Sequence, residues 1–529
     1  MKNSKGLTKV AIALSLGLVS NLSFAEAKVK NVILMIGDGM GPGQMSLLEE
    51  YATKAPNSIY NGRDTAMKTI IDNGVLGMSM HSPFDALVVD SAASASHLAS
   101  GVDSPSEALG LDKDGNPVDS VLEIAKRLGK ATGLVSDTRL THATPAAFAA
   151  HQRHRSLENE IAAEMLAVGP DVMLSGGLRY FVPESVNEKG ALYKQLMEQT
   201  GGSIEIKSKR NDEKNLLAEA SDAGYSVVHT RNGLADAKGD KVLGLFAYSG
   251  MQDGITYSHT KDSKKRTMPS LKEMTVKALD VLAKDPDGFF LMIEGGQIDW
   301  ASHSNDAGTT LHEMLKFDET IQYVYEWIKD RDDTLLVVTA DHETGGFGFS
   351  YSRANIPKAK KLSGSAFKDN DYKPNFNFGT LPTLDRLYQQ KVSFGNMLAE
   401  FDKTDKTPES LLKIVNANSE FKIDLAQAKK ILETEDNKFY DPDNSYLKLK
   451  TFPKVDDFEA FYVYGQDIRG DLIARELGEQ QNIVWGTGTH TNTPVAVVAV
   501  GPDELTKKFS RLSHHTDIGK LLIEAVENK

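Results

Sequence analysis

The sequence contains no cysteine, so the chain can form no disulfide and cannot carry a lipid on an N-terminal cysteine. Many proteins of oxidising compartments depend on disulfides. This chain must instead be stabilised by packing, to which bound metal ions could add. Its 529 residues are enough to bury a core without covalent cross-links.

Long apolar runs are also absent, and none reaches the ~20 residues that a transmembrane helix needs. A short run near the N-terminus follows lysines and precedes small residues, which is the pattern of a secretory signal peptide. We expect cleavage after Ala25, although Ala27 fits the same rule. Residues 1–25 would then be a signal peptide, and the protein would be periplasmic or secreted with no membrane anchor. The pattern consists of Lys2, Lys5 and Lys9, the stretch Val10 to Val19, and Ser23-Phe24-Ala25.

Basic residues are fewer than acidic ones, with 60 Lys and Arg against 73 Asp and Glu. Residues 1–25 hold three lysines and no acid, so the remaining chain has 57 basic against 73 acidic residues, a net charge of −16. Nucleic acids are bound mainly through Lys and Arg, and we therefore expect no nucleic-acid binding. A small anion could bind only where metal ions and an arginine outweigh the carboxylates locally.

Short apolar segments alternate with helical patterns along most of the chain. This alternation predicts an α/β fold, a three-layer sandwich with a central, mostly parallel sheet and helices on both faces. In such sheets ligands bind at the carboxyl ends of the strands. The predicted strands are Val29 to Ile36, Phe289 to Ile293, Leu335 to Thr339 and Val495 to Val500. The predicted helices include Val118 to Leu128, Ser270 to Ala283 and Thr516 to Val526.

Residues 350–480 depart from this alternation, because they are richer in Asn, Lys, aromatic residues and turn signals. Within them we expect one helix to begin at Thr407-Pro408 and another to cover Asp424 to Glu433. We interpret residues 26–350 and 480–529 as one α/β domain, with residues 350–480 as an insertion into it.

A run of small residues begins at Asp90-Ser91-Ala92-Ala93, after the strand-like segment Ala86 to Val89. It predicts a helix with Ser91 at its N-terminus, where free amides and the helix dipole favour a bound anion. The alternative reading of these residues alone is that Asp90 or Ser91 only caps the helix.

Acidic and histidine residues follow several of the predicted strands. Asp299 and His303, spaced i,i+4, could bind one cation from a helix face, although such pairs are often simple ion pairs. A phosphatase needs a nucleophile, a cation to lower the pKa of that nucleophile, a cation for the leaving oxygen and a donor for the phosphoryl oxygens. Further candidates with suitable side chains are Asp38, Glu294, Asp341, His342 and His490.

Three stretches of the chain resemble signatures of the alkaline phosphatase family. They are Asp90-Ser91-Ala92, Glu294-Gly295-Gly296-Gln297-Ile298-Asp299-x-x-x-His303 and Thr339-Ala340-Asp341-His342-Glu343-Thr344-Gly345-Gly346. Residues 350–480 are similar to the insertion of large-insert marine bacterial members. The resemblance implies hydrolysis of small-molecule phosphate monoesters to alcohol and inorganic phosphate through a phosphoseryl intermediate. It also implies two Zn²⁺ and one Mg²⁺ per subunit and a homodimer, with the insertion at the dimer interface as one option.

The same resemblance implies a role for each candidate residue. Ser91 would be the nucleophile, and Arg155 would bind two phosphoryl oxygens. Arg153 is the competing arginine, but the spacing from Thr144 favours Arg155. His142 and Trp300 depart from the usual family pattern beside the metals, which leaves the magnesium site open. The implied ligands are Asp299, His303 and His490 for the first zinc, Asp38, Asp341 and His342 for the second, and Asp38, Thr144 and Glu294 for magnesium.

Other interpretations are weaker. A sulfatase would carry Cys or Ser in a Cys/Ser-x-Pro-x-Arg motif, which is absent around Ser91, and a phosphodiesterase lacks a counterpart of Arg155. A periplasmic phosphate-binding or metal-storage protein needs no serine beside a metal pair. The segment Asp112 to Glu123 imitates a calcium loop, but its sixth position is Pro117 where Gly is required. The remaining histidines show no partner pattern, and we interpret them as structural, with His514-His515 as a surface pair at a helix start; the others are His81, His97, His229, His259 and His312.

Overall fold

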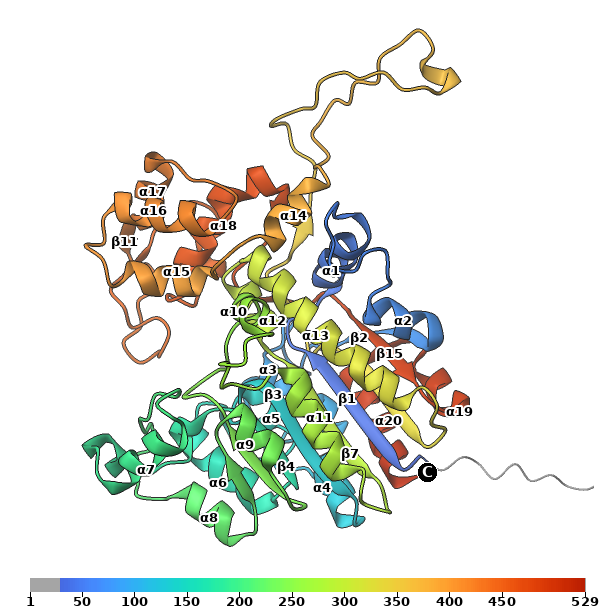
Figure 1. Ribbon diagram of the computed structural model, residues 1–529, viewed down its shortest axis with the longest axis vertical. Coiled ribbons are helices and arrows are strands. Elements are labelled where there is room, and N and C mark those ends of the chain that lie inside the picture. Colours follow the sequence, from blue (N-terminus) through green and yellow to red (C-terminus); the bar gives the residue numbers. More distant parts are fainter. Residues whose placement is uncertain (1–28, 529) are drawn as a thin grey trace, which may run out of the picture.

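The computed structural model describes residues 29–528, and the predicted signal peptide, residues 1–25, lies outside them. A ten-stranded sheet forms the centre of the fold, with the strand order β16-β2-β15-β8-β1-β7-β3-β4-β6-β5 (Figure 1). Every pairing in it is parallel except those of β15, which runs antiparallel to β2 and β8. The strands are β1 (Asn31–Gly37), β2 (Val75–Met80), β3 (Ala131–Arg139), β4 (Val172–Gly176), β5 (Ser226–Val228), β6 (Val242–Leu245), β7 (Phe289–Gly295), β8 (Thr334–Thr339), β15 (Val495–Val500) and β16 (Leu512–His514).

Helices cover both faces of the sheet, so the predicted α/β three-layer architecture is confirmed. Successive residues of β1 point to opposite faces. Ile33 and Met35 belong to one hydrophobic core, whereas Leu34 and Ile36 belong to the other. The first core includes α1 (Pro42–Lys54), α2 (Ala66–Asn73), α11 (Leu271–Leu282) and α13 (Ala307–Ile328). The second includes α3 (Ser91–Ser100), α4 (Val121–Arg127), α6 (Glu158–Val168), α8 (Leu216–Asp222) and α20 (His515–Glu527).

The predicted strands and helices are confirmed with one exception. Ala86 to Val89 is not a strand, because Pro83 begins a turn that the Ala86 amide closes. Leu87 in this segment is 79% exposed, so the apolar run does not mark a buried strand. Ser270 caps α11 in the predicted capping box with Glu273, and the segment that imitates a calcium loop is a turn closed on the Asp112 carboxylate.

Between β8 and β15 the described chain adds no strand to the ten-stranded sheet. An extended arm of residues 351–380 projects from the body, and a group of helices follows it (Figure 1). Two short antiparallel pairs join the two ends of this region, β10 with β13 and β9 with β14. The second pair places His490 opposite Thr344, beside the end of β8. The elements are β9 (Glu343–Thr344), β10 (Gly348–Phe349), α14 (Pro382–Tyr388), α15 (Phe394–Phe401), α16 (Pro408–Asn418), α17 (Leu425–Leu432), β11 (Thr434–Asp436), β12 (Thr451–Pro453), α18 (Ile468–Gln481), β13 (Ile483–Val484) and β14 (His490–Thr491).

A buried lysine fixes the start of α12, the helix that follows β7. Lys316 of α13 forms ion pairs with Asp137 at 2.9 Å and Glu313 at 2.5 Å, and only 5% of its side chain is exposed. Asp137 in turn accepts a hydrogen bond from the Gly296 amide at 2.7 Å. The remaining helices are α5 (Ala143–Ala146), α7 (Ala191–Gln199), α9 (Arg231–Asp236), α10 (Gly254–Thr260), α12 (Gln297–His303) and α19 (Asp503–Thr506).

Replacing this lysine should destabilise the fold strongly. Lys316→Met leaves Asp137 and Glu313 buried without their cation, which typically costs about 3–5 kcal/mol of unfolding free energy. Urea unfolding followed by tryptophan fluorescence measures the change. Lys329→Met, at an exposed position at the end of the same helix, is the control and should shift the unfolding midpoint little. Equal midpoints for the two variants would contradict the structural role of Lys316.

Candidate functional site

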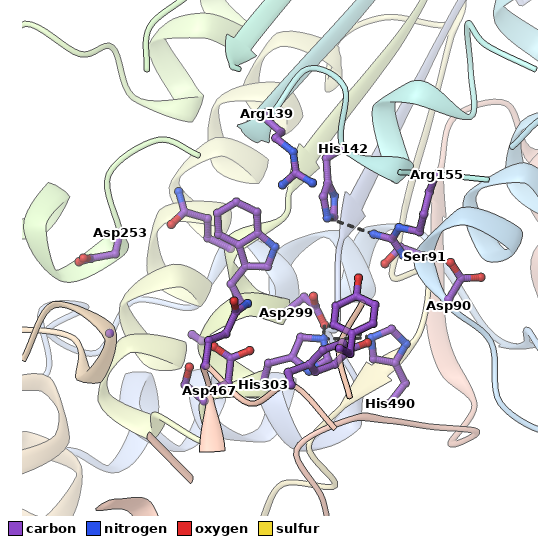
Figure 2. Close-up of a pocket in the computed structure, with 18 of the residues that line it drawn as sticks. Asp90, Ser91, Arg139, His142, Arg155, Asp253, Asp299, His303, Asp467 and His490 are labelled. Carbon is purple, nitrogen blue, oxygen red and sulfur yellow. Dashed lines mark hydrogen bonds and ion pairs between the residues drawn. The ribbon is translucent and has the colours of Figure 1, made fainter. Parts of the chain in front are cut away.

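A cleft of about 1030 Å³ lies at the carboxyl ends of β1, β3, β7 and β8 (Figure 2). Its lining includes Ser91, His142, Arg155, Trp300 and His490. Asp38 and Asp341, which follow β1 and β8, are fully buried beneath it. The sheet therefore brings residues from distant parts of the chain to one edge, as parallel α/β sheets do.

Asp90 and Ser91 have different roles at the start of α3. The Asp90 carboxylate accepts hydrogen bonds from the amides of Ala92 at 3.0 Å and Ala93 at 3.2 Å, so Asp90 is the helix cap. The Ser91 hydroxyl is not used for capping and lies 3.2 Å from His342 Nε2. The expectation that the helix amides bind an anion needs correction, because Asp90 occupies those of Ala92 and Ala93. The Ser91 amide is not among those that Asp90 accepts.

The first predicted ligand group, Asp299, His303 and His490, is assembled in the structure. His303 Nε2 lies 3.2 Å from Asp299 Oδ1 and 3.2 Å from His490 Nε2, and the third distance, from His490 Nε2 to Asp299 Oδ1, is 3.6 Å. Two ligands of a tetrahedral zinc ion with bonds of ~2.0–2.2 Å are separated by about 3.4 Å. The three atoms therefore have the spacing of three corners around one ion.

The tautomers of these histidines fit the same geometry. The Nδ1 atom of His303 donates to the Gly488 carbonyl at 2.8 Å, and that of His490 donates to the Val89 carbonyl at 2.8 Å. When the ring is neutral, each Nε2 is the unprotonated nitrogen, and it faces the group. Backbone carbonyls commonly orient metal-binding histidines in this way.

The second predicted group, Asp38, Asp341 and His342, is equally compact. His342 Nε2 lies 3.4 Å from Asp38 Oδ1 and 3.3 Å from Asp341 Oδ2. Those two carboxylate oxygens are buried and make no hydrogen bond. Buried polar atoms without partners are rare and require an explanation, which a shared cation supplies. The backbone at Gly39 passes close to Asp299. Gly39 has φ +73°, and a Cβ there would lie 2.7 Å from the Asp299 Cα.

A third group contains Asp38, His142 and Glu294. Thr144 Oγ1, predicted as a magnesium ligand, lies 3.4 Å from Asp38 Oδ2. His142 Nδ1 and Glu294 Oε1 are 3.9 Å apart, and neither makes a hydrogen bond. The oxygen donors suit Mg²⁺, whereas an imidazole nitrogen suits a transition metal better. The sequence predicted Thr144 as a magnesium ligand and His142 only as a neighbour of the site. In the structure Thr144 lies beside Asp38, and His142 lies beside Glu294.

Burial makes it costly for the carboxylates of the three groups to be charged at the same time. Burial, followed by the charges of Asp341 and Asp299, raises the pKa of Asp38 well above its ordinary value. Burial and the Asp299 charge do the same to the pKa of Asp341. For Asp299, burial is the largest single influence and raises the pKa, but the charge and hydrogen bond of His303 together with the charges of His490 and His342 lower it well below its ordinary value. Cations at the three groups would relieve the repulsion among these carboxylates.

Arg155 faces this cleft, and Arg153 does not. The Arg155 guanidinium donates to Asp90 Oδ2 at 2.9 Å and lies 3.2 Å from His142 Nε2 (Figure 2). Arg153 is exposed and does not line the cleft. Trp300 packs edge-on against His142, with 5.8 Å between the ring centroids. The structure thus separates the two arginines that the sequence left in competition.

Sequence reasoning missed three residues around the site. Tyr464, from the region between β8 and β15, packs edge-on against His303 at 4.8 Å and lines the cleft. Asp467 lies in the same lining, and burial raises its pKa to about 6. His515 was expected at the surface, but it is fully buried and its Nε2 donates to the Asp341 carbonyl at 3.0 Å. No local pattern marks these residues, because each is defined by a distant contact.

The chain is similar to known proteins over nearly its whole length. The alkaline phosphatase family model matches residues 29–528. Alkaline phosphatase 3 of Bacillus subtilis is 31% identical over 98% of this chain and 96% of its own length. Alkaline phosphatase 4 of the same organism is 35% identical over 74% and 80%.

Solved structures are similar as well. The Thermus thermophilus alkaline phosphatase has a TM-score of 0.73 and 25% identity, covering 98% of this chain and 96% of that one. A cold-active alkaline phosphatase from a psychrophilic Shewanella species has a TM-score of 0.67 and 25% identity, covering 94% and 99%.

Removal of metal ions should destabilise the protein. With a chelator, the carboxylates at the three groups lose their counter-ions, and an ion present at 1,000 times its Kd contributes about 4 kcal/mol. We expect a lower Tm with EDTA and recovery on adding Zn²⁺ and Mg²⁺, measured by differential scanning fluorimetry. Asp38→Asn, which alters two groups at once, should reduce the effect of EDTA. A Tm that does not respond to EDTA, in protein shown by elemental analysis to have contained metal, would contradict this.

Proposed function

The chain belongs to the alkaline phosphatase family of metal-dependent phosphomonoester hydrolases, and we propose that it cleaves small-molecule phosphate monoesters through a phosphoserine at Ser91. The observation that supports the proposal most is the position of the Ser91 hydroxyl. It lies 3.2 Å from His342 Nε2, at the start of α3 and in the cleft that Arg155 lines. The hydroxyl therefore borders both a candidate metal group and a cation that can bind phosphate.

We assign the three groups to metal ions as the family resemblance implies. Asp299, His303 and His490 would hold one Zn²⁺, and Asp38, Asp341 and His342 a second. Asp38, Thr144 and Glu294 would hold Mg²⁺, with His142 close enough to take part. When bound, such ions lower the pKa of the Ser91 hydroxyl and of water and stabilise charge on the leaving oxygen.

In the first step the Ser91 oxygen attacks phosphorus in line with the leaving alcohol. The Ser91 hydroxyl loses its proton to solvent, a bond forms between Ser91 Oγ and phosphorus, and the bond from phosphorus to the alcohol oxygen breaks. The alcohol then leaves with a proton from solvent. Arg155 donates to the phosphoryl oxygens, and its planar guanidinium suits two of them. Asp90 holds Arg155 in place through their 2.9 Å ion pair.

In the second step water attacks the phosphoserine and releases inorganic phosphate. The Ser91 oxygen is the leaving group and regains its proton. Each step inverts the configuration at phosphorus, so the overall result is retention. Arg155 contacts the same phosphoryl oxygens in both steps, and its pKa, which the Asp90 carboxylate raises despite burial, keeps it charged at alkaline pH.

The rival functions differ in substrate. A sulfatase or a phosphodiesterase would act on sulfate esters or phosphate diesters, and a binding or storage protein would show no turnover. Comparing aryl monoesters, diesters and sulfate esters under the same conditions separates them. Phosphomonoesterase activity far above the other two supports the proposal.

We also propose a location and an assembly. In the described part of the chain no helix is both long and apolar enough to cross a membrane. With the signal peptide expected at residues 1–25, we place the protein in the periplasm or outside the cell. We treat residues 350–480 as an insertion and propose a homodimer in which its arm contacts the partner, because the arm exposes Tyr351 (60%) and Phe378 (64%). Sedimentation velocity should give twice the mass of one chain, and a monomer would remove this proposal.

Replacement of Ser91 tests the nucleophile. Ser91→Ala should lower kcat on an aryl phosphate by about a thousandfold or more, because no oxygen remains to accept the phosphoryl group. Ser100→Ala, at the other end of α3, is the control and should retain activity. Wild-type turnover by Ser91→Ala would refute the assignment.

Replacement of the two arginines tests phosphate binding. Arg155→Ala should lower kcat/KM by about 10- to 100-fold, since a hydrogen bond to a charged group contributes about 1.5–3 kcal/mol. It should also weaken inhibition by inorganic phosphate. Arg153→Ala should leave both unchanged. The reverse result would show that Arg153 is the phosphate ligand.

A further inference from the structure

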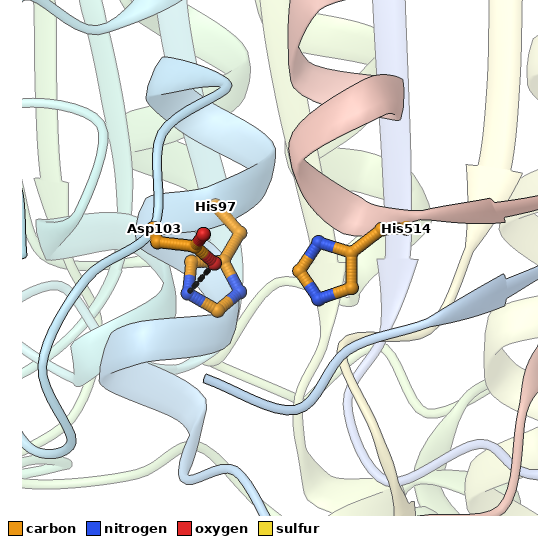
Figure 3. A group of neighbouring side chains, drawn as sticks. All are labelled: His97, Asp103 and His514. Atoms are coloured by element: carbon orange, nitrogen blue, oxygen red, sulfur yellow. Dashed lines mark ion pairs between the residues drawn. The ribbon is translucent and has the colours of Figure 1, made fainter. Parts of the chain in front are cut away.

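A second cluster of metal-binding side chains lies at the opposite end of α3 from Ser91 (Figure 3). His97 comes from the last turn of α3, Asp103 from the loop after it, and His514 from the junction of β16 and α20. One donor atom from each lies within 4.8 Å of the others. We propose that these three residues form an additional site for a transition-metal ion such as Zn²⁺, outside the phosphatase cleft.

His97 is the observation that carries the proposal. Its side chain is fully buried, and neither ring nitrogen makes a hydrogen bond. Buried imidazoles normally have a partner for each nitrogen. The hydroxyls of Ser104 and Ser513, which adjoin Asp103 and His514 in sequence, are also buried without a partner. The two unpaired nitrogens of His97 are therefore the polar atoms of this cluster that a bound ion would satisfy.

The three side chains have nearly the spacing of a metal site, although His97 and Asp103 are also close enough for a long ion pair. His97 Nε2 and Asp103 Oδ1 are 3.9 Å apart, too far for a hydrogen bond. A small closure would bring them to the ~3.4 Å that separates two ligands of tetrahedral zinc. The rings of His97 and His514 are 5.4 Å apart and inclined at 43°. His303 and His490 in the cleft have nearly the same arrangement, 5.0 Å and 36°.

The backbone holds the two histidines in this arrangement. Gly519 of α20 packs directly on the end of α3, where an added Cβ would lie 2.4 Å from the His97 carbonyl oxygen. Gly101, with φ +69°, ends α3 and turns the chain toward Asp103. His97 and His514 are therefore positioned before any ion binds, which lowers the cost of binding.

The chemistry of the three donors selects the class of ion. Two imidazoles and one carboxylate suit Zn²⁺ and other first-row transition metals better than Mg²⁺ or Ca²⁺. His97 lies near the C-terminal end of a helix, where a cation is favoured. Asp103 is 41% exposed, which leaves room for water as a further ligand and a path for the ion.

Ion binding would change one existing contact. His514 Nδ1 accepts from the Thr516 amide at 3.2 Å, and Nε2 donates to the Ser82 carbonyl at 2.9 Å. Both nitrogens of His514 therefore have a partner, and an ion bound at Nε2 would replace its proton and the contact with Ser82. Uptake should therefore release a proton.

Metal stoichiometry tests the site. The full mature protein is stripped with chelator, reloaded with Zn²⁺, freed of excess ion and measured by inductively coupled plasma mass spectrometry. We expect His97→Ala and Asp103→Asn each to retain one zinc fewer than the wild type, with phosphomonoesterase activity largely kept. His229→Gln, a change at a buried histidine that donates to the Leu245 carbonyl, is the control and should retain the full number.

Asp103→Asn decides the question if His97→Ala does not fold, because Asp103 is partly exposed and its replacement keeps the shape. Reloading with Co²⁺ gives a second readout, since the wild type should show an additional set of cobalt absorption bands that the Asp103 variant lacks. Equal zinc content and equal cobalt spectra in wild type and variant would overturn the proposal and leave a hydrated polar pocket. Activity that depends on Ser91 is measured separately, so either proposal can fail alone.

Discussion

Four buried carboxylates gathered at one edge of the sheet, Asp38, Glu294, Asp299 and Asp341, are the constraint on which the rest of this structure depends. Arg155 alone cannot offset the mutual repulsion of these buried carboxylates, since its nearest acidic partner is Asp90. The ligand atoms of Asp299, His303 and His490 have the spacing of a tetrahedral metal site, and bound cations would offset the repulsion among the carboxylates. Bound cations would also explain how an overall acidic chain can act on an anionic substrate, because they would reverse the sign of the charge in the cleft.

Two helices that carry residues of the site connect it to the rest of the fold. Helix α3 presents Ser91 at its N-terminus, and Gly519 of α20 lets that helix pack closely against the other end of α3. Helix α12 carries Asp299 and His303, and its start is held by Asp137, which the buried Lys316 neutralises in turn. Helices of the core therefore position Ser91, Asp299 and His303, as precise positioning of ligands requires, whereas Asp38, Asp341 and Arg155 lie in the segments between elements.

The sequence predicted the sheet and most residues of the candidate site, because local sequence patterns mark both. Apolar strands ending in Asp or Glu marked Asp38, Glu294 and Asp341, and family signatures covered Ser91 and its neighbours. Contacts without a local pattern were missed or misread. Tyr464 reaches the cleft from the region between β8 and β15, and His515 is turned inward by the packing of α20. In the segment Ala86 to Val89 the apolar residues Leu87 and Val88 are exposed and form no strand. The cluster of His97 with His514 depends on a contact between α3 and the start of α20, which are far apart in the sequence.

The central claim is that the buried carboxylate and histidine groups hold metal ions that act with Ser91 on phosphate. X-ray diffraction at the zinc absorption edge, from crystals soaked with orthovanadate, tests it most directly. The account predicts anomalous peaks within the Asp299–His303–His490 and Asp38–Asp341–His342 groups, with vanadium bound to Ser91 Oγ and contacted by Arg155. Crystals of active protein with no peaks in these groups, or with vanadate bound away from Ser91, would contradict it.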